Sequence, residues 1–141
     1  MARRDTFVDH LAEVPLFRAC SRKARSTVAR RAKERRVGAG EVVINEGEAG
    51  NEFFVIMDGH AQVRRRGKKV ATLGPGQFFG DLAVLDKAPR NATVTAETPM
   101  ALLVLGQREF SALIEEVPGF AHKLLAGLAH RLREAVAKSV Q

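Results

Sequence analysis

Residues 74–94 contain a glycine and an arginine at a spacing that suits the binding of a phosphate. Two phenylalanines lead into Gly80, and Arg90 follows directly after Pro89. A glycine at the entry of a short helix lets a ligand approach backbone N–H groups that the helix leaves unpaired. An arginine adds a planar group of donors that fits two phosphate oxygens at once. The segment therefore predicts a site for an anion.

The residues that follow the glycine refine this prediction. We expect one turn of helix at 81–85, where the N–H groups of Leu82 and Ala83 would bind the phosphate together with Arg90. Asp81 would repel a phosphate, and two roles are open for its carboxylate. It either accepts hydrogen bonds from a ribose hydroxyl or only complements the helix dipole. The first role implies a ligand that joins one phosphate to one ribose.

The composition indicates one folded domain that spans residues 1–141. The chain is long enough to bury a core without a metal or a disulfide. Cys20 is its only cysteine, no apolar run reaches the roughly 18 residues of a membrane span, and the N-terminus lacks an apolar signal segment. We therefore expect a cytoplasmic protein that does not interact with a membrane.

The hydrophobic period changes twice along the chain. Residues 1–34 and 107–141 carry apolar residues at helical spacing, whereas residues 35–106 alternate in short runs separated by glycine turns. Closely spaced strands that are interrupted by one short helix predict an antiparallel sandwich or barrel with a loop inserted in its wall. The expected fold class is therefore mainly β, with flanking helices.

Two stretches resemble the cyclic nucleotide-binding domain family, of the type found in catabolite activator protein and the regulatory subunit of protein kinase A. Residues 79–85 (Phe-Gly-Asp-Leu-Ala-Val-Leu) and 89–94 (Pro-Arg-Asn-Ala-Thr-Val) are similar to its phosphate-binding cassette, Phe-Gly-Glu-Leu-Ala-Leu and then Pro-Arg, a small residue and Ala. The likeness covers nearly the whole chain. It implies a jelly-roll-like β-roll, or double-stranded β-helix, at 35–106, with a cassette at 79–93 and closing helices at 107–141.

The resemblance also implies the ligand and the residues that would bind it. The expected ligand is a 3',5'-cyclic nucleotide, cAMP before cGMP, in a sensor of bacterial character that signals through movement of its C-terminal helix. The candidate ligand-binding residues are Phe79, Gly80, Asp81, Leu82, Ala83, Arg90, Asn91 and Ala92 in the cassette, Val70 and Ala71 on the preceding strand, and Leu132 and Val136 on the closing helix. Asp81 stands where the family pattern has glutamate, and Asn91 leaves the choice of base open.

The C-terminal helix predicts a protein partner or a homodimer. One apolar stripe joins Phe120, Leu124, Leu125, Leu128, Leu132 and Val136, and it is wide enough to cover the roll and to contact something more. Family members often pair two such helices. Gly127 interrupts the helix, and it either permits close packing or acts as a hinge, of which we favour packing.

Two other functions are weighed against the sensor. The net charge of +7 is concentrated between Arg18 and Arg36 and in the run from Arg64 to Lys69. Such a surface is either merely solvated or binds nucleic acid, although it lacks interleaved aromatic residues. A β-roll that has lost its nucleotide and binds an acidic partner is the other alternative. The four histidines show no metal-ligand spacing and no catalytic constellation stands out, so we expect neither a metal, a catalytic cofactor nor an enzyme.

Overall fold

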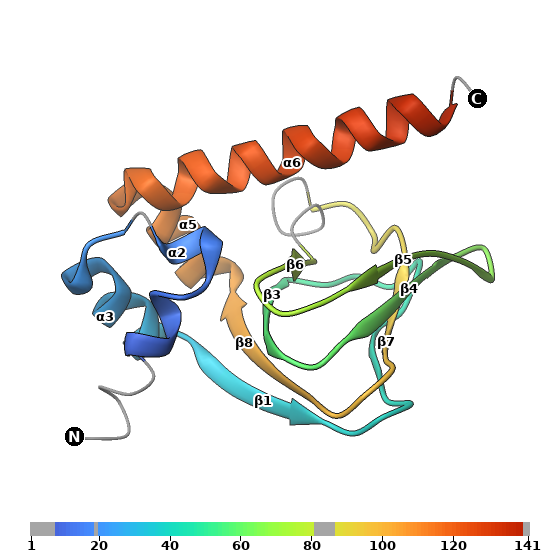
Figure 1. Cartoon of the computed structure of the whole chain (residues 1–141), viewed down its shortest axis with the longest axis horizontal. Helices are drawn as coiled ribbons and strands as arrows, with labels where there is room; N and C mark the ends of the chain where they lie inside the picture. The colour runs from blue at the N-terminus through green and yellow to red at the C-terminus, as the bar shows by residue number, and fades with distance from the viewer. Residues whose placement is uncertain (1–7, 19, 81–86, 140–141) are drawn as a thin grey trace.

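This computed structural model describes residues 8–18, 20–80 and 87–139. They form eight strands in two sheets, with helices at both ends of the chain (Figure 1). The strands are β1 (Lys33–Val37), β2 (Val42–Ile44), β3 (Glu52–Asp58), β4 (Ala61–Arg65), β5 (Lys68–Leu73), β6 (Phe78–Phe79), β7 (Thr93–Ala96) and β8 (Met100–Gly106). The helices are α2 (Pro15–Arg18), α3 (Arg22–Arg31), α5 (Gln107–Glu116) and α6 (Pro118–Ser139), and residues 8–11 are also helical. The predicted helical turn at 81–85 lies outside the described residues.

All strand pairings of the described residues are antiparallel. One sheet has the order β1-β8-β3-β6 and the other the order β2-β7-β4-β5. At one edge of the first sheet β1 pairs with β8, which are the first and the last of these strands in the sequence. The structure is therefore an antiparallel β-roll with flanking helices, as the sequence predicted.

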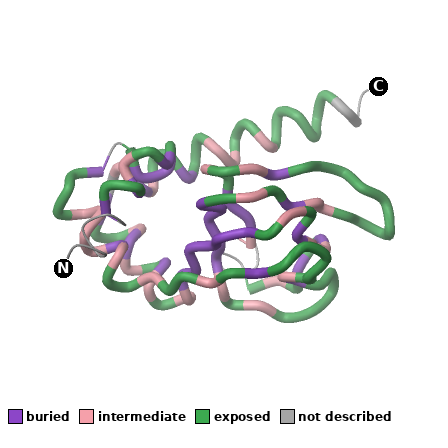
Figure 2. Tube along the Cα trace, turned by 60° about the horizontal axis from the view of Figure 1, so that its bottom comes forward, coloured by how far each residue is buried: buried purple, intermediate pink, exposed green. Residues whose placement is uncertain are grey.

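Strands β3 and β8 separate two hydrophobic cores. Phe53, Val55 and Met57 face the helices, whereas Phe54 and Ile56 lie between the two sheets. Because successive side chains of a strand point to opposite faces, a strand covered on both sides reads as a continuous apolar run. The middle of β8 is apolar for the same reason, and Figure 2 shows that burial concentrates in these central strands.

The N-terminal helices complete the core on one face of the first sheet. Ser21 caps α3, because its hydroxyl oxygen accepts a hydrogen bond from the backbone N–H of Ala24 at 3.1 Å. Val28 is fully buried, and Ala24 packs against the same core. Burial raises the pKa of the nearby Cys20 thiol above its usual value, although the charge of Arg25 opposes the shift. A raised pKa favours the protonated form of the thiol.

Helix α6 packs against Phe78 of β6 as well as against Phe53 of β3. A Cβ added to Gly127 would lie 2.9 Å from Cζ of the Phe78 ring, so the glycine permits close packing, as we favoured. Arg131 lies over the same ring at 4.3 Å and also donates a hydrogen bond to the Phe78 carbonyl oxygen. Phe78 is thus held by two residues of one face of α6.

Candidate functional site

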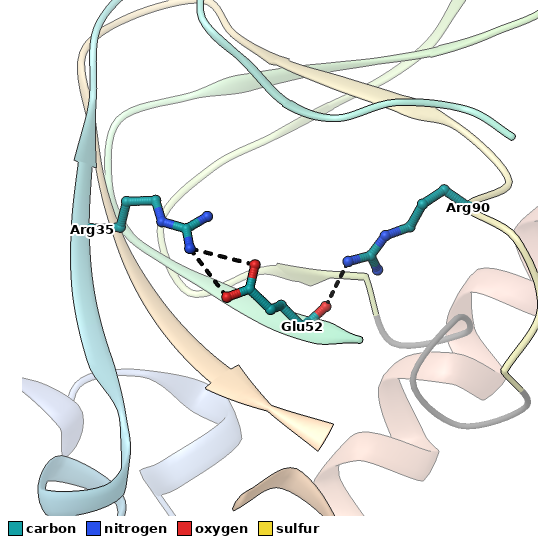
Figure 3. A network of polar contacts seen from close by, with 3 residues as sticks. All are labelled: Arg35, Glu52 and Arg90. Carbon is teal, nitrogen blue, oxygen red and sulfur yellow. Dashed lines mark hydrogen bonds and ion pairs between the residues drawn. The ribbon is translucent and has the colours of Figure 1, made fainter. Parts of the chain in front are cut away.

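Arg90 is buried, with a relative exposure of 6%, although its side chain carries a charge. Its Nη1 donates to the carbonyl oxygen of Gly80 and its Nη2 to the carbonyl oxygen of Glu52, each at 3.0 Å. Glu52 begins β3 and Gly80 directly follows β6, so the guanidinium joins the ends of two paired strands (Figure 3). A buried cation requires hydrogen-bond acceptors, and here main-chain oxygens supply them.

The backbone of Arg90 is held as firmly as its side chain. Its N–H donates to the carbonyl oxygen of Glu48 at 2.8 Å, and its carbonyl oxygen accepts from the N–H of Gly47 at 2.8 Å. Gly50, in the same loop, lies directly against the guanidinium, where an added Cβ would overlap it. The loop between β2 and β3 therefore fixes the direction in which Arg90 points.

Gly80 is closely approached by the side chain of Arg90 and by the carbonyl oxygen of Glu52. The approach of a ligand to this glycine stays a prediction. The φ of Gly80, +83°, lies in the region that favours glycine, and an added Cβ would lie 2.8 Å from the Glu52 carbonyl oxygen and 2.9 Å from Nη1 of Arg90. The glycine is thus required both by its backbone angle and by the arginine beside it. Phe79, the residue before it, is buried and stacks on Phe54 with ring centroids 4.8 Å apart.

Glu52 connects Arg90 with a second arginine. Its carboxylate pairs with Arg35 of β1, from Nη2 to Oε2 at 3.1 Å, while its carbonyl oxygen accepts from Arg90 (Figure 3). The Phe54 ring lies near both guanidiniums, with its centroid 5.5 Å from Cζ of Arg35 and 5.9 Å from Cζ of Arg90. Sequence reasoning missed this network, because it counted Arg35 only as part of a basic surface. The inward position of Phe54 in an alternating strand was the available signal.

A cavity of about 190 Å³ opens beside Arg90. Residues 43–45 and the loop from Glu48 to Glu52 line it, together with Phe54. A larger surface hollow of about 550 Å³ lies at the beginning of α5, and neither Arg90 nor any other residue of the predicted cassette lines it. Of these two hollows of the described residues, the smaller one has the buried cation Arg90 in its wall.

The remaining predicted site residues have different surroundings. Ala92 is buried and Asn91 is exposed, and both directly follow Arg90. Val70 and Ala71 are exposed on β5, and Leu132 (66%) and Val136 (53%) are exposed on the last turns of α6. The structure thus brings Phe79, Gly80 and Arg90 together and buries Ala92, whereas the four candidate ligand-binding residues on β5 and α6 lie at the surface. Asp81, Leu82 and Ala83 lie outside the described residues.

Neither a metal-ligand cluster nor a membrane-spanning helix occurs among the residues that the structure describes. Residues 8–18, 20–80 and 87–139 contain no group of three or more His, Cys, Asp or Glu side chains arranged to hold a metal ion. Over the same ranges, no helix has both the length and the apolar character that crossing a membrane requires.

The fold and Arg90 together define a β-roll domain with a buried cation in the wall of a cavity. Residues 34–117 match the family model of the cyclic nucleotide-binding domain. A cAMP-dependent protein kinase regulatory subunit of Yarrowia lipolytica is 38% identical over 117 residues, which are 82% of this chain and 31% of the relative. The chain therefore belongs to the cyclic nucleotide-binding domain family.

Solved structures show the same relationship. A structure of PKAR CBD2 with Sp-2Cl-cAMPS bound is 30% identical, with a TM-score of 0.80 over 94% of this chain and 90% of that one. The catabolite activator protein of Thermus thermophilus is 31% identical, with a TM-score of 0.80 over 88% of this chain and 61% of that one. The chain spans about a third of the length of the Yarrowia relative, so the similarity concerns a regulatory binding domain and not a whole kinase subunit.

Proposed function

We propose that this chain binds a 3',5'-cyclic nucleotide, with cAMP as the first candidate and cGMP as the second. The observation that carries the proposal is the buried guanidinium of Arg90, held between Gly80 and Glu52 beside a polar cavity. A cyclic phosphate bears one negative charge and two exocyclic oxygens, which match the fork of a guanidinium. The solved relative with Sp-2Cl-cAMPS bound, 30% identical to this chain, supports the same class of ligand.

The proposed roles of the cassette residues follow from their chemistry. Arg90 would donate to the phosphate, as would the N–H groups of Leu82 and Ala83, while Asp81 would accept from the ribose hydroxyl. Val70 and Ala71 would contact the base, and Leu132 and Val136 would cover it after a movement of α6 that removes them from water. Asn91 keeps both purines acceptable, because an amide offers a donor and an acceptor.

The test is a calorimetric titration of the purified chain with cAMP and with cGMP. We expect saturable binding of at least one of them, and a loss of affinity of about 100-fold in Arg90→Ala, because truncating one partner of a buried charge pair costs several kcal/mol. Arg90→Lys keeps the charge but not the fork, so it should recover only part of the affinity.

Circular dichroism and thermal unfolding are the controls for this titration. Arg90→Ala also removes donors from the carbonyl oxygens of Gly80 and Glu52, so folding must be measured separately from binding. No heat and no thermal shift with either nucleotide, in a folded unchanged chain, would contradict the proposal. That outcome would favour the alternative of a β-roll that binds an acidic partner through its basic surface.

We further propose that α6 transmits the signal to a protein partner or to a second copy of the chain. Leu125, Leu132 and Val136 lie on one exposed side of this helix, and exposed apolar stripes of this kind are typical of helix pairing. Leu132→Glu is expected to lower the weight-average mass measured by light scattering at high protein concentration, relative to the unchanged chain. A matched change on α3, Lys23→Glu, should leave the mass unaltered, and equal masses for all three proteins would exclude self-association through this helix.

A regulatory role without catalysis and a cytoplasmic location complete the proposal. The relatives of this chain include regulatory subunits, which supports a regulatory role. Cys20 is buried and free, which suits a reducing compartment.

A further inference from the structure

Arg65, at the end of β4, reaches the segment that carries Arg90. Its Nε donates to the carbonyl oxygen of Asn91 at 3.2 Å. Asn91 directly follows Arg90, so the guanidinium of Arg65 contacts the segment that carries Arg90. In the sequence, Arg65 belongs to the basic run from Arg64 to Lys69, which by itself indicates no role for this residue.

The strand register assigns Arg65 to the inner face of the roll. Val63 of β4 pairs with Val94 of β7; Val94 belongs to the core between the sheets, and Val63 is partly buried against it. Arg64 pairs with Thr93 one residue further on, and neither belongs to this core. Because alternate residues of a strand share a face, Arg65 returns to the side of Val63.

The same register places Arg65 beside the predicted cassette. Extending the β4–β7 pairing by one residue sets Arg65 opposite Ala92, which is buried and is a predicted ligand contact. On the other side of β4, Val63 pairs with Ala71, a predicted base contact of β5. Arg65 therefore lies between β5, which is expected to contact the base, and the segment at Asn91 and Ala92, which is expected to contact the phosphate.

Neighbouring contacts hold this end of the hairpin in place. The N–H of Arg66 donates to Oε1 of Glu46 at 2.9 Å, and the N–H of Glu46 donates to Oγ1 of Thr93 at 2.9 Å. Arg65 itself is exposed, and its bond to Asn91 uses Nε. Its two terminal amino groups make no hydrogen bond to any other described residue, so they are available to an anion that lies beside Asn91.

We propose that Arg65 is a second ligand-binding cation of this site, which contacts the phosphate side of the bound cyclic nucleotide from β4. The proposal rests on the proposed function and adds a residue to it. An exposed arginine is strongly hydrated, so its contribution to affinity is smaller than that of buried Arg90 and depends more on salt.

The test compares two neighbouring arginines of one strand. Arg65→Gln and Arg64→Gln remove the same charge and add the same side chain, but they face opposite sides of β4. Titration with the nucleotide that the unchanged chain binds should give about 10-fold weaker binding for Arg65→Gln and less than a 2-fold change for Arg64→Gln. The affinity of Arg65→Gln should also fall less steeply as the salt concentration rises, because one charge contact is missing.

The outcomes separate this inference from the proposed function. Equal losses in both variants would show that the charge acts only as a long-range field, and would overturn the assignment of a contact. Unchanged affinity in Arg65→Gln would overturn it as well, while leaving nucleotide binding intact. If the unchanged chain binds no cyclic nucleotide, the proposed function fails, and this inference fails with it.

Discussion

Gly50→Ala is expected to weaken cyclic nucleotide binding about 100-fold while the chain stays folded. The added Cβ would overlap the guanidinium of Arg90, so the arginine must leave its position against the loop. The carbonyl oxygens of Gly80 and Glu52 would then lose their donors, and the cation would no longer point at the cavity. Calorimetric titration measures the affinity, and circular dichroism measures the fold.

Gly38→Ala is the matched control for this variant. It makes the same chemical change in another turn, where an added Cβ meets no atom within 4 Å. We expect its affinity to equal that of the unchanged chain. Wild-type affinity in Gly50→Ala would show that the observed position of Arg90 is not needed for binding, and the proposed site would then have to be moved.

Phe53→Ala is expected to lower the free energy of unfolding by about 3–5 kcal/mol. Phe53 is completely buried, and its ring centroid lies 4.6 Å from that of Phe110, 5.6 Å from that of Phe78 and 6.4 Å from that of Phe120. It therefore joins β3, β6, α5 and α6 in one cluster, and truncation would leave a cavity at their common centre. Urea unfolding followed by circular dichroism measures the change.

Leu125→Ala provides the comparison for a large apolar residue outside the core. Leu125 is 65% exposed, so the same kind of truncation should change the free energy of unfolding by no more than about 0.5 kcal/mol. Similar losses in both variants would contradict the position of Phe53 at the centre of the core.

The fold was largely predictable because the pattern of apolar residues in a strand shows which of its faces are buried. The apolar run Phe53–Met57 reads as a strand buried on both faces, and glycines mark the turns around it. The helix α3 was also predictable, since Ser21 is a standard N-cap residue and does cap it. These features depend on local propensity and on period, which a sequence displays directly.

The candidate site was predictable only in part. The chemistry of Arg90 and Gly80 follows from residue type, but the acceptors of Arg90 do not. One of them is the carbonyl of Glu52, which is 38 residues away in sequence, and any residue type offers a carbonyl. The position of Leu132 was equally hidden, because the period of α6 shows which residues share a side but not where the roll beneath the helix ends.

The proposed movement of α6 would turn about the contact of Gly127 and Arg131 with Phe78. From Gly127 to Ala137 the helix extends for about 15 Å, so a rotation of about 10° about this contact would displace the far end of the helix by about 3 Å. Phe78 lies only two residues before Gly80, whose carbonyl oxygen holds Arg90. In the proposed function, a small change in the position of Arg90 would thus displace the far end of α6, where the proposed partner would bind.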